Sequence, residues 1–280
     1  MTNAHGKEVD KTYLSVDNAE SRGFIHRDYI AHCLRWSHVC KRLMRRSAYK
    51  KAVVLDIGCG KELPLAKLLY SSRMFPYLYY GIDAGKIDNF NFGKYDDAVA
   101  LYEQEDFAKT WETINQLLVE DETPLTHVVC FEVLEHVEPK HCIKILRAIR
   151  KMCTDDTEVL ISTPNWNGRD TAGNHVNEIR WHVLYLILNR LGFHVEDCYG
   201  TFASQTDYKH LLTIEERTIF NQLSEYYDSD LVSCLFAPLY PAESRNCLWI
   251  LKKCRPIIDP MPKLKEPWSS SEKWEDFKHA

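Results

Sequence analysis

Two glutamates and two histidines stand just beyond the ends of predicted strands. Glu132, Glu135 and His136 follow the apolar run HVVCF, and His175 lies in the loop after the next strand, which ends in STPN. Because parallel strands present their carboxyl ends at one edge of a sheet, we expect these four side chains to converge on one pocket. A histidine beside a carboxylate can remove a hydroxyl proton, and the same residue types can instead ligate a divalent ion.

These residues support two kinds of chemistry. We interpret Glu135, His136 and His175 as candidate catalytic residues. The same three residues, together with Glu132, are candidate ligands of Mg²⁺ or Mn²⁺. A structural alternative places both glutamates on the first turn of a helix, where the dipole favours acids, and packs His136 beneath the loop. For the metal, both alternatives stay open at this point.

A second group of residues is typical of a cofactor site. A buried strand containing Asp56 is followed by Gly58, Cys59 and Gly60 just before a predicted helix. Glycines at such a turn let the backbone approach a ligand closely. The turn lacks the third glycine of a dinucleotide-binding motif and carries Glu62 nearby, which suits a cationic cofactor better than a pyrophosphate.

The next two predicted strands end in further candidate cofactor ligands. Asp83 follows the second strand, where an acid accepts hydrogen bonds from ribose hydroxyls. After the third strand, Asp106 offers an acceptor for an adenine amino group and Phe107 an apolar face for its ring. Each residue alone could cap a helix or fill the core. Suitable residues at three successive strand ends predict a cofactor site.

These motifs resemble those of the class I S-adenosylmethionine-dependent methyltransferases. LDIGCG is similar to the first motif of that family, GID to its acidic ribose-binding motif and EDF to its adenine-contacting motif, so the resemblance covers about residues 25–200. It implies a Rossmann-like fold, S-adenosylmethionine as cofactor, and Asp56 and Gly58 near its methionine part. It also implies that the helix containing Tyr29 covers the cofactor, and we count Glu132 among the cofactor-binding candidates.

Two branches of that family share the remaining pattern. The segments EVLEHV, STPN and H-x-N-E resemble the ubiquinone-biosynthesis type of O-methyltransferase. The Glu-x-x-Glu-His segment is also similar to the 3′-terminal 2′-O-methyltransferases of small RNAs, in which it binds a divalent metal. The net charge of -5 and the lack of a recognisable RNA-binding module favour a small-molecule hydroxyl as acceptor, with RNA as the alternative.

Two further function classes are disfavoured. No Asn/Asp-Pro-Pro-Tyr segment follows the strand HVVCF, so methylation of amino groups on DNA is not expected. A methyltransferase-like scaffold that binds without catalysis is the third interpretation of the sequence. The intact acids and histidines argue against it, because a degenerate site is expected to lose them first.

Alternating apolar runs and helical patterns predict the elements that position these residues. We expect a Rossmann-like α/β fold with a seven-stranded, mostly parallel sheet flanked by helices. The predicted strands are residues 52–57, 78–82, 98–102, 126–131, 158–162, 193–199 and 247–252. The predicted helices are residues 25–46, 62–70, 107–119, 140–153 and 179–191. The aromatic-rich stretch 201–240 predicts a helical lid over the acceptor pocket.

Composition sets the remaining expectations. We expect a polar tail at 1–22, a methyltransferase domain at 23–254 and a Pro-rich charged tail at 255–280. The lack of a signal peptide or membrane-length apolar run predicts a cytoplasmic protein without a membrane partner. The ten cysteines form no CxxC pair and are expected to be reduced and mostly buried. We interpret the basic stretch 35–51 as a solvated helix face.

Overall fold

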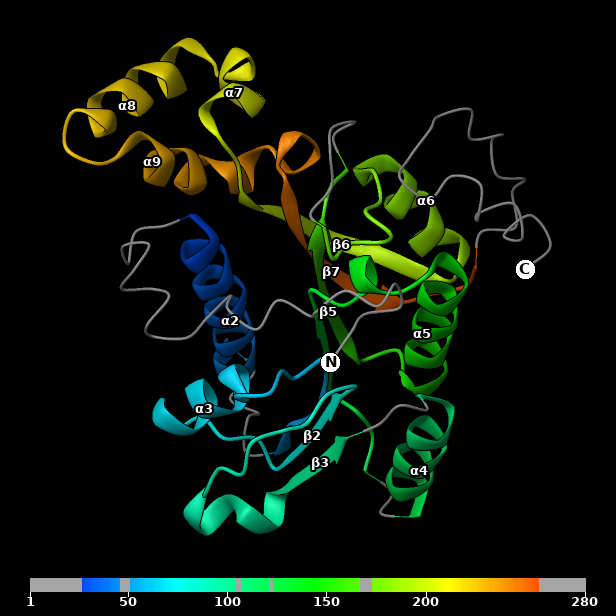
Figure 1. Ribbon diagram of the computed structural model, residues 1–280. Coiled ribbons are helices and arrows are strands. Elements are labelled where there is room, and N and C mark those ends of the chain that lie inside the picture. The colour runs from blue at the N-terminus through cyan, green and yellow to red at the C-terminus, as the bar shows by residue number, and fades with distance from the viewer. Residues whose placement is uncertain (1–26, 46–50, 104–106, 121–122, 167–172, 257–280) are drawn as a thin grey trace.

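Short apolar runs in the sequence form one buried sheet whose strands pair in the order β3-β2-β1-β4-β5-β7-β6 (Figure 1). The computed structural model describes residues 27–45, 51–103, 107–120, 123–166 and 173–256. Strand β7 runs antiparallel to both β5 and β6, and the other pairs are parallel. The predicted seven-stranded, mostly parallel α/β sheet is therefore confirmed. The strands are β1 (Val53–Ile57), β2 (Leu78–Asp83), β3 (Val99–Glu103), β4 (His127–Phe131), β5 (Glu158–Pro164), β6 (Phe193–Phe202) and β7 (Asn246–Lys253).

Helices cover both faces of this sheet because each turns one apolar stripe towards it. In α5, Cys142, Leu146 and Ile149 are completely buried at helical spacing. Helices α4 to α6 pack on one face and α2 and α3 on the other (Figure 1). None of the described helices is long and apolar enough to span a membrane. The helices flanking the sheet are α2 (Arg27–Arg45), α3 (Pro64–Ser71), α4 (Phe107–Glu120), α5 (Pro139–Met152) and α6 (Trp181–Arg190).

Strands β5 and β6 extend beyond their predicted ends, to Pro164 and Phe202, and the starts of two helices differ from the prediction for identifiable reasons. Helix α3 begins at Pro64 rather than at residue 62, because Leu63 adopts a left-handed conformation with φ 54° and proline suits the first helical turn. Helix α6 begins at Trp181 rather than at residue 179, because Ile179 pairs with Asn165 in an isolated β-bridge. That bridge fixes the end of the long loop between β5 and α6.

Strand β1, the third of the seven strands in the sheet, helps to set the position of the site. It pairs with β2 on one side and β4 on the other, so the order of the strands reverses beside it. Chains leaving the carboxyl ends of β1 and β4 turn to opposite faces of the sheet, and α/β proteins commonly bind ligands beside such a reversal. The glycine turn after β1 and the acidic segment after β4 meet at this point.

Helices between β6 and β7 form the predicted insertion. They build an apolar cluster of their own that includes Tyr208, Phe220 and Phe236. Gly200 on β6 allows the close approach, because a Cβ there would lie 2.2 Å from the carbonyl oxygen of Ala237. The insertion contains α7 (Gln205–Tyr208), η4 (Lys209–Leu211), α8 (Ile214–Ser224), α9 (Ser229–Phe236), η5 (Ala237–Leu239) and η6 (Pro241–Glu243).

The basic stretch within 35–51 is not simply a solvated helix face, which corrects that interpretation. Arg35 is completely buried. The side chain of Arg42 is 13% exposed and forms ion pairs with Glu158 at 3.1 Å and with Asp197 at 3.1 Å. These two cations are therefore used inside the fold and do not contribute to a surface track.

The cysteines are all free thiols, and most of them are buried. Burial in apolar surroundings raises the pKa of Cys40 to about 11 and that of Cys142 to about 12. Such thiols stay protonated near neutral pH, which agrees with the prediction of reduced core cysteines.

Candidate active site

A sharp turn after β4 leads into the 3₁₀ helix η3 (Leu134–His136). Glu132 has a φ of 55°, in the left-handed region that non-glycine residues rarely adopt. Its amide donates to the carbonyl oxygen of Ser162 at 3.0 Å, which fixes the turn against β5. A Cβ on Gly58 would lie 2.3 Å from Cγ2 of Val133, so the turns after β1 and β4 are in direct contact.

Three side chains of metal-ligand type meet just beyond this turn. Glu135, His136 and His175 each place one ligand atom within 4.8 Å of the others. Nε2 of His136 lies 3.9 Å from Oε1 of Glu135. The two imidazole rings stand edge to face, with their centroids 5.0 Å apart. The structure thus brings together three of the four residues singled out at the ends of these strands.

Main-chain hydrogen bonds hold the loop of His175 against η3. The carbonyl oxygen of Glu135 accepts from the amides of Val176 at 2.7 Å and Asn177 at 3.1 Å. The side-chain amide of Asn177 donates to the carbonyl oxygen of Leu134 at 3.2 Å. Residues separated by some forty positions in the chain are therefore fixed in one arrangement by three hydrogen bonds.

The hydrogen-bond partners of the histidines define which ring nitrogen is available. Nδ1 of His136 lies 3.2 Å from the carbonyl oxygen of Asn174. Nδ1 of His175 lies 2.5 Å from Oε1 of Glu178. Because carbonyl and ionised carboxylate oxygens only accept, each Nδ1 carries a hydrogen and each Nε2 of the neutral ring offers a lone pair. Metal-binding histidines are commonly oriented in this way.

The surroundings shift the pKa values of Glu135 and His136 in opposite directions. Burial and then the charge of Glu132 raise the pKa of Glu135 well above its usual value. One carboxylate oxygen accepts from the hydroxyl of Thr163 at 3.2 Å, whereas the buried Oε1 has no hydrogen-bond partner among the described residues. Burial lowers the pKa of His136, which keeps this ring neutral near pH 7. A buried carboxyl oxygen without a hydrogen-bond partner is costly unless a proton or a cation satisfies it.

Glu132 belongs to a different contact network. Its carboxylate forms an ion pair with Arg35 from α2 at 3.2 Å. It also accepts from the hydroxyl of Ser162 at 2.8 Å and from the side-chain amide of Asn246 at 3.0 Å. Arg35 in turn donates to Asn246 at 3.2 Å and contacts His32. Within the described part of the chain, Glu132 is therefore not part of the group formed by Glu135, His136 and His175.

The glycine turn after β1 is shaped by the end of β2. The amides of Gly58 and Cys59 both donate to the carbonyl oxygen of Ile82, at 2.7 and 3.0 Å. The carboxylate of Asp83 accepts from the amides of Gly60 at 2.9 Å and Gly85 at 2.7 Å. Each carboxylate oxygen keeps a further lone pair for an additional donor.

Asp56 is buried beneath this turn. Burial raises its pKa to about 7, a hydrogen bond of 2.5 Å from the hydroxyl of Tyr79 opposes that rise, and the charge of Asp83 adds to it. The hydroxyl group of Tyr79, a completely buried residue, therefore holds the side chain of Asp56 in place.

The structure describes three of the predicted cofactor residues incompletely or not at all. Asp106 lies outside the described residues, and Phe107 and Tyr29 are described only as the first residue of α4 and a residue of α2.

Three other residues of the site were not singled out from the sequence. Arg35 looked like one of several surface cations, and Asn246 carried no signal because its partners are distant in the chain. Glu178 could have been found, since it follows His175 by three residues.

Comparison with known protein families gives one decisive match. The model described as a methyltransferase domain matches residues 29–212, which is more than half of the chain. The chain belongs to this methyltransferase domain family. The protein is thus an enzyme, and the predicted methyltransferase is confirmed at the level of the family. A comparison with curated proteins finds no match.

Several solved structures are similar to this methyltransferase. An S-adenosylmethionine-dependent methyltransferase from Archaeoglobus fulgidus is 20% identical with a TM-score of 0.44, over 78% of this chain and 94% of that one. Magnesium protoporphyrin IX methyltransferase from Synechocystis PCC 6803 is 14% identical with a TM-score of 0.48, over 86% and 88%. A chain of the Pnkp1/Rnl/Hen1 RNA repair complex is 13% identical with a TM-score of 0.45, over 80% and 42%.

The ion pair between α2 and the turn after β4 leads to a stability prediction for this methyltransferase. Arg35→Met leaves the carboxylate of Glu132 without its cation and should lower the free energy of unfolding by about 2 to 3 kcal/mol. The double variant Arg35→Met with Glu132→Gln should be more stable than Arg35→Met alone, because no unpaired charge remains. Urea unfolding of both variants and of Glu132→Gln measures this coupling. Strictly additive losses would contradict it.

Proposed function

We propose that this methyltransferase transfers the methyl group of S-adenosylmethionine to a hydroxyl oxygen of a small molecule, with Glu135, His136 and His175 holding a divalent ion beside the acceptor. The observation that carries the proposal is the convergence of these three ligand atoms within 4.8 Å. They lie directly after the turn that contacts the glycine turn of β1, where the cofactor is expected.

The cofactor placement is supported by the turns after β1 and β2. Gly58 and Gly60 have φ angles of 71° and 74°, so the backbone is free of side chains at the point of approach. Asp83 faces this turn and retains lone pairs for the ribose hydroxyls. Asp56 and Cys59 belong to the same edge of the sheet, and Asp106 and Phe107 remain candidates from the sequence alone.

The residues fit a divalent ion such as Mg²⁺ or Mn²⁺. One carboxylate and two neutral imidazoles form an acceptable donor set, and the unpaired Oε1 of Glu135 is the kind of atom that a cation satisfies. The hydrogen bonds from His136 to Asn174 and from His175 to Glu178 orient both rings. Glu132 was a fourth candidate ligand, and its ion pair with Arg35 supports a positioning role instead.

The methyl transfer itself needs alignment more than a protein nucleophile. The acceptor oxygen attacks the methyl carbon while the bond to sulfur breaks, the bonding electrons remain on the sulfur of S-adenosylhomocysteine, and the hydroxyl proton is released to water. A bound divalent ion would lower the pKa of a hydroxyl that ligates it. The protein side chains hold the acceptor in line with the methyl group, and the oriented rings of His136 and His175 define where its oxygen lies.

A small acceptor is supported by the insertion and by the charge. Helices α7 to α9 extend beyond the carboxyl edge of the sheet near α2 (Figure 1), and Asn165 at the end of β5 donates to the carbonyl oxygens of Pro241 and Ser244. An insertion tied to this edge suits the role of a lid over a compact ligand. The net charge of -5 and the internal pairing of Arg35 and Arg42 favour a small molecule over RNA.

Methylation of an RNA 2′-hydroxyl is the second candidate. The observation that favours it is the same group of Glu135, His136 and His175, because the small-RNA 2′-O-methyltransferases that the sequence resembles bind a divalent metal through such a segment. The two candidates share the metal and the oxygen acceptor, and they differ in how the acceptor is recognised.

Cofactor binding is tested by calorimetry with S-adenosylhomocysteine. Asp83→Ala removes the acceptor for the ribose hydroxyls and should weaken binding by about 1 to 3 kcal/mol. Asp88→Ala removes a half-exposed carboxylate in the same loop and serves as the control with unchanged affinity. Absence of binding by the wild-type protein would reject the cofactor assignment.

Metal dependence is tested by Mn²⁺ titration of the chelator-treated protein. Glu135→Gln should abolish binding of one equivalent, and Glu178→Gln should weaken it about 10- to 100-fold through the orientation of His175. Glu138→Gln, at the start of α5, should leave it unchanged. Methyl transfer should stop in EDTA and resume with Mg²⁺ or Mn²⁺. Full activity in EDTA would reject the metal and leave His136 or His175 as a general base.

Acceptor class is tested by methyl transfer to hydroxylated aromatic metabolites and to RNA ends, with labelled S-adenosylmethionine. We expect transfer to a small-molecule hydroxyl, with a loss of at least about 100-fold in His136→Ala. An RNA with a 3′-terminal 2′-deoxynucleotide is the matched control for the second candidate. Robust transfer to RNA that requires the 2′-hydroxyl and falls steeply with added salt would favour the RNA reaction instead.

A further inference from the structure

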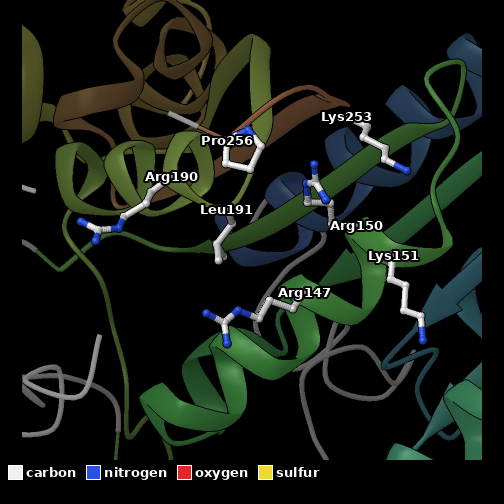
Figure 2. A pocket seen from close by; sticks show the side chains of 7 residues that line it. All are labelled: Arg147, Arg150, Lys151, Arg190, Leu191, Lys253 and Pro256. Atoms are coloured by element: carbon white, nitrogen blue, oxygen red, sulfur yellow. The ribbon is translucent and has the colours of Figure 1, made fainter. Parts of the chain in front are cut away.

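A cavity of about 570 Å³ gathers basic side chains at the edge of the sheet opposite the candidate active site (Figure 2). Arg147, Arg150 and Lys151 come from the last turns of α5, Arg190 from the end of α6 and Lys253 from the end of β7. The other two residues that line it are Leu191 and Pro256. Five cations thus line one hollow, and no acidic residue lines it within the described part of the chain; we call this the basic pocket.

The register of the strands fixes the location of the basic pocket. Lys253 pairs with Phe193, the first residue of β6, and its neighbour Lys252 pairs with Glu158, the first residue of β5. Both positions lie at the amino edge of the parallel strands, whereas Glu135 follows the carboxyl end of β4. The basic pocket is therefore separated from the candidate active site by the length of the sheet.

Two of the five cations are held by the fold itself. Arg150 donates to the carbonyl oxygens of Gly192 at 3.3 Å and Cys254 at 3.0 Å. Lys253 donates to the carbonyl oxygen of Cys153 at 2.6 Å, just beyond the end of α5. These bonds are consistent with cations that stabilise helix carboxyl ends. They also leave both positive charges in place without neutralising them.

Arg147 and Lys151 make no such hydrogen bonds to carbonyl oxygens of the described residues. Both are exposed, and neither forms a hydrogen bond or ion pair with another described residue. Figure 2 shows both side chains leaving α5, with their charged ends pointing in different directions. Like charges gathered at one hollow repel one another, and a bound anion would relieve that repulsion.

We propose that the basic pocket binds the phosphate groups of a small polyphosphorylated ligand. Guanidinium groups match phosphate oxygens in paired hydrogen bonds, and lysine adds a mobile point charge. The volume is that of a site for a nucleotide-sized molecule. Leu191 and Pro256 give the pocket an apolar wall on which the uncharged part of such a ligand packs. The cations are clustered in one hollow, which suits a compact polyanion better than an extended strand.

The test is calorimetric titration of the full chain with inorganic tripolyphosphate in metal-free buffer, since this probe lacks the adenosine that the cofactor site would recognise. Arg147→Ala with Lys151→Ala should weaken saturable binding by about tenfold or more, because two charge-assisted contacts are lost. Lys144→Ala with Arg217→Ala removes the same number of exposed charges from α5 and α8 and should leave the affinity unchanged. Thermal melting checks that all variants are folded.

Three results would overturn the proposal. One is the absence of saturable binding by the wild-type protein, and another is equal weakening in both double variants, which would indicate a response to net charge only. The third is preferential binding of a single-stranded RNA at equal phosphate concentration, lost in the Arg147 and Lys151 variant, which would assign the pocket to a nucleic acid. Binding of tripolyphosphate that falls with ionic strength and requires Arg147 and Lys151 supports the small ligand.

Discussion

The main-chain carbonyl of Glu135 is the contact on which the arrangement of the site depends. By accepting from the amides of Val176 and Asn177, it joins the segment after β4 to the loop after β5. The side chains of Glu135, His136 and His175 are then held close together by backbone geometry, so their convergence needs no ligand. Such preorganisation lowers the entropy lost on binding. Its cost is the buried Oε1 of Glu135, which the described protein groups leave without a partner.

Arg35 connects the same edge of the sheet to α2. Its ion pair with Glu132 stabilises a residue whose backbone is in the left-handed region, and Asn246 from β7 bonds to both side chains. The ion pair therefore links the helix over one face, the turn after β4 and the antiparallel strand. A movement of α2 would displace Arg35 and so change its ion pair with Glu132, which lies two residues before the start of η3.

The sequence was sufficient for the fold because its strong signals are local. Buried runs such as HVVCF, the Asp56 to Gly60 turn and the amphipathic pattern of α5 each lie within a few residues. It was insufficient for contacts made between distant elements. Nothing local distinguishes Arg35 from its basic neighbours, and only the folded chain places it against Glu132 and Asn246. For the same reason four candidate ligands were indicated together, while the structure separates Glu132 from the other three.

The two edges of the sheet carry opposite kinds of charge, and strand direction accounts for this. Loops after parallel strands lead to helix amino ends, and the acidic residues Glu132, Glu135 and Asp83 lie at this edge, at or just after the ends of β4 and β2. Helices return their carboxyl ends to the other edge, where Arg150, Lys151 and Arg190 are favoured by the helix dipoles. A net charge of -5 therefore averages over two distinct surfaces. We propose the first for a cationic methyl donor and a divalent ion and the second for an anion, so a single polarity along the strands would serve two ligands of opposite charge.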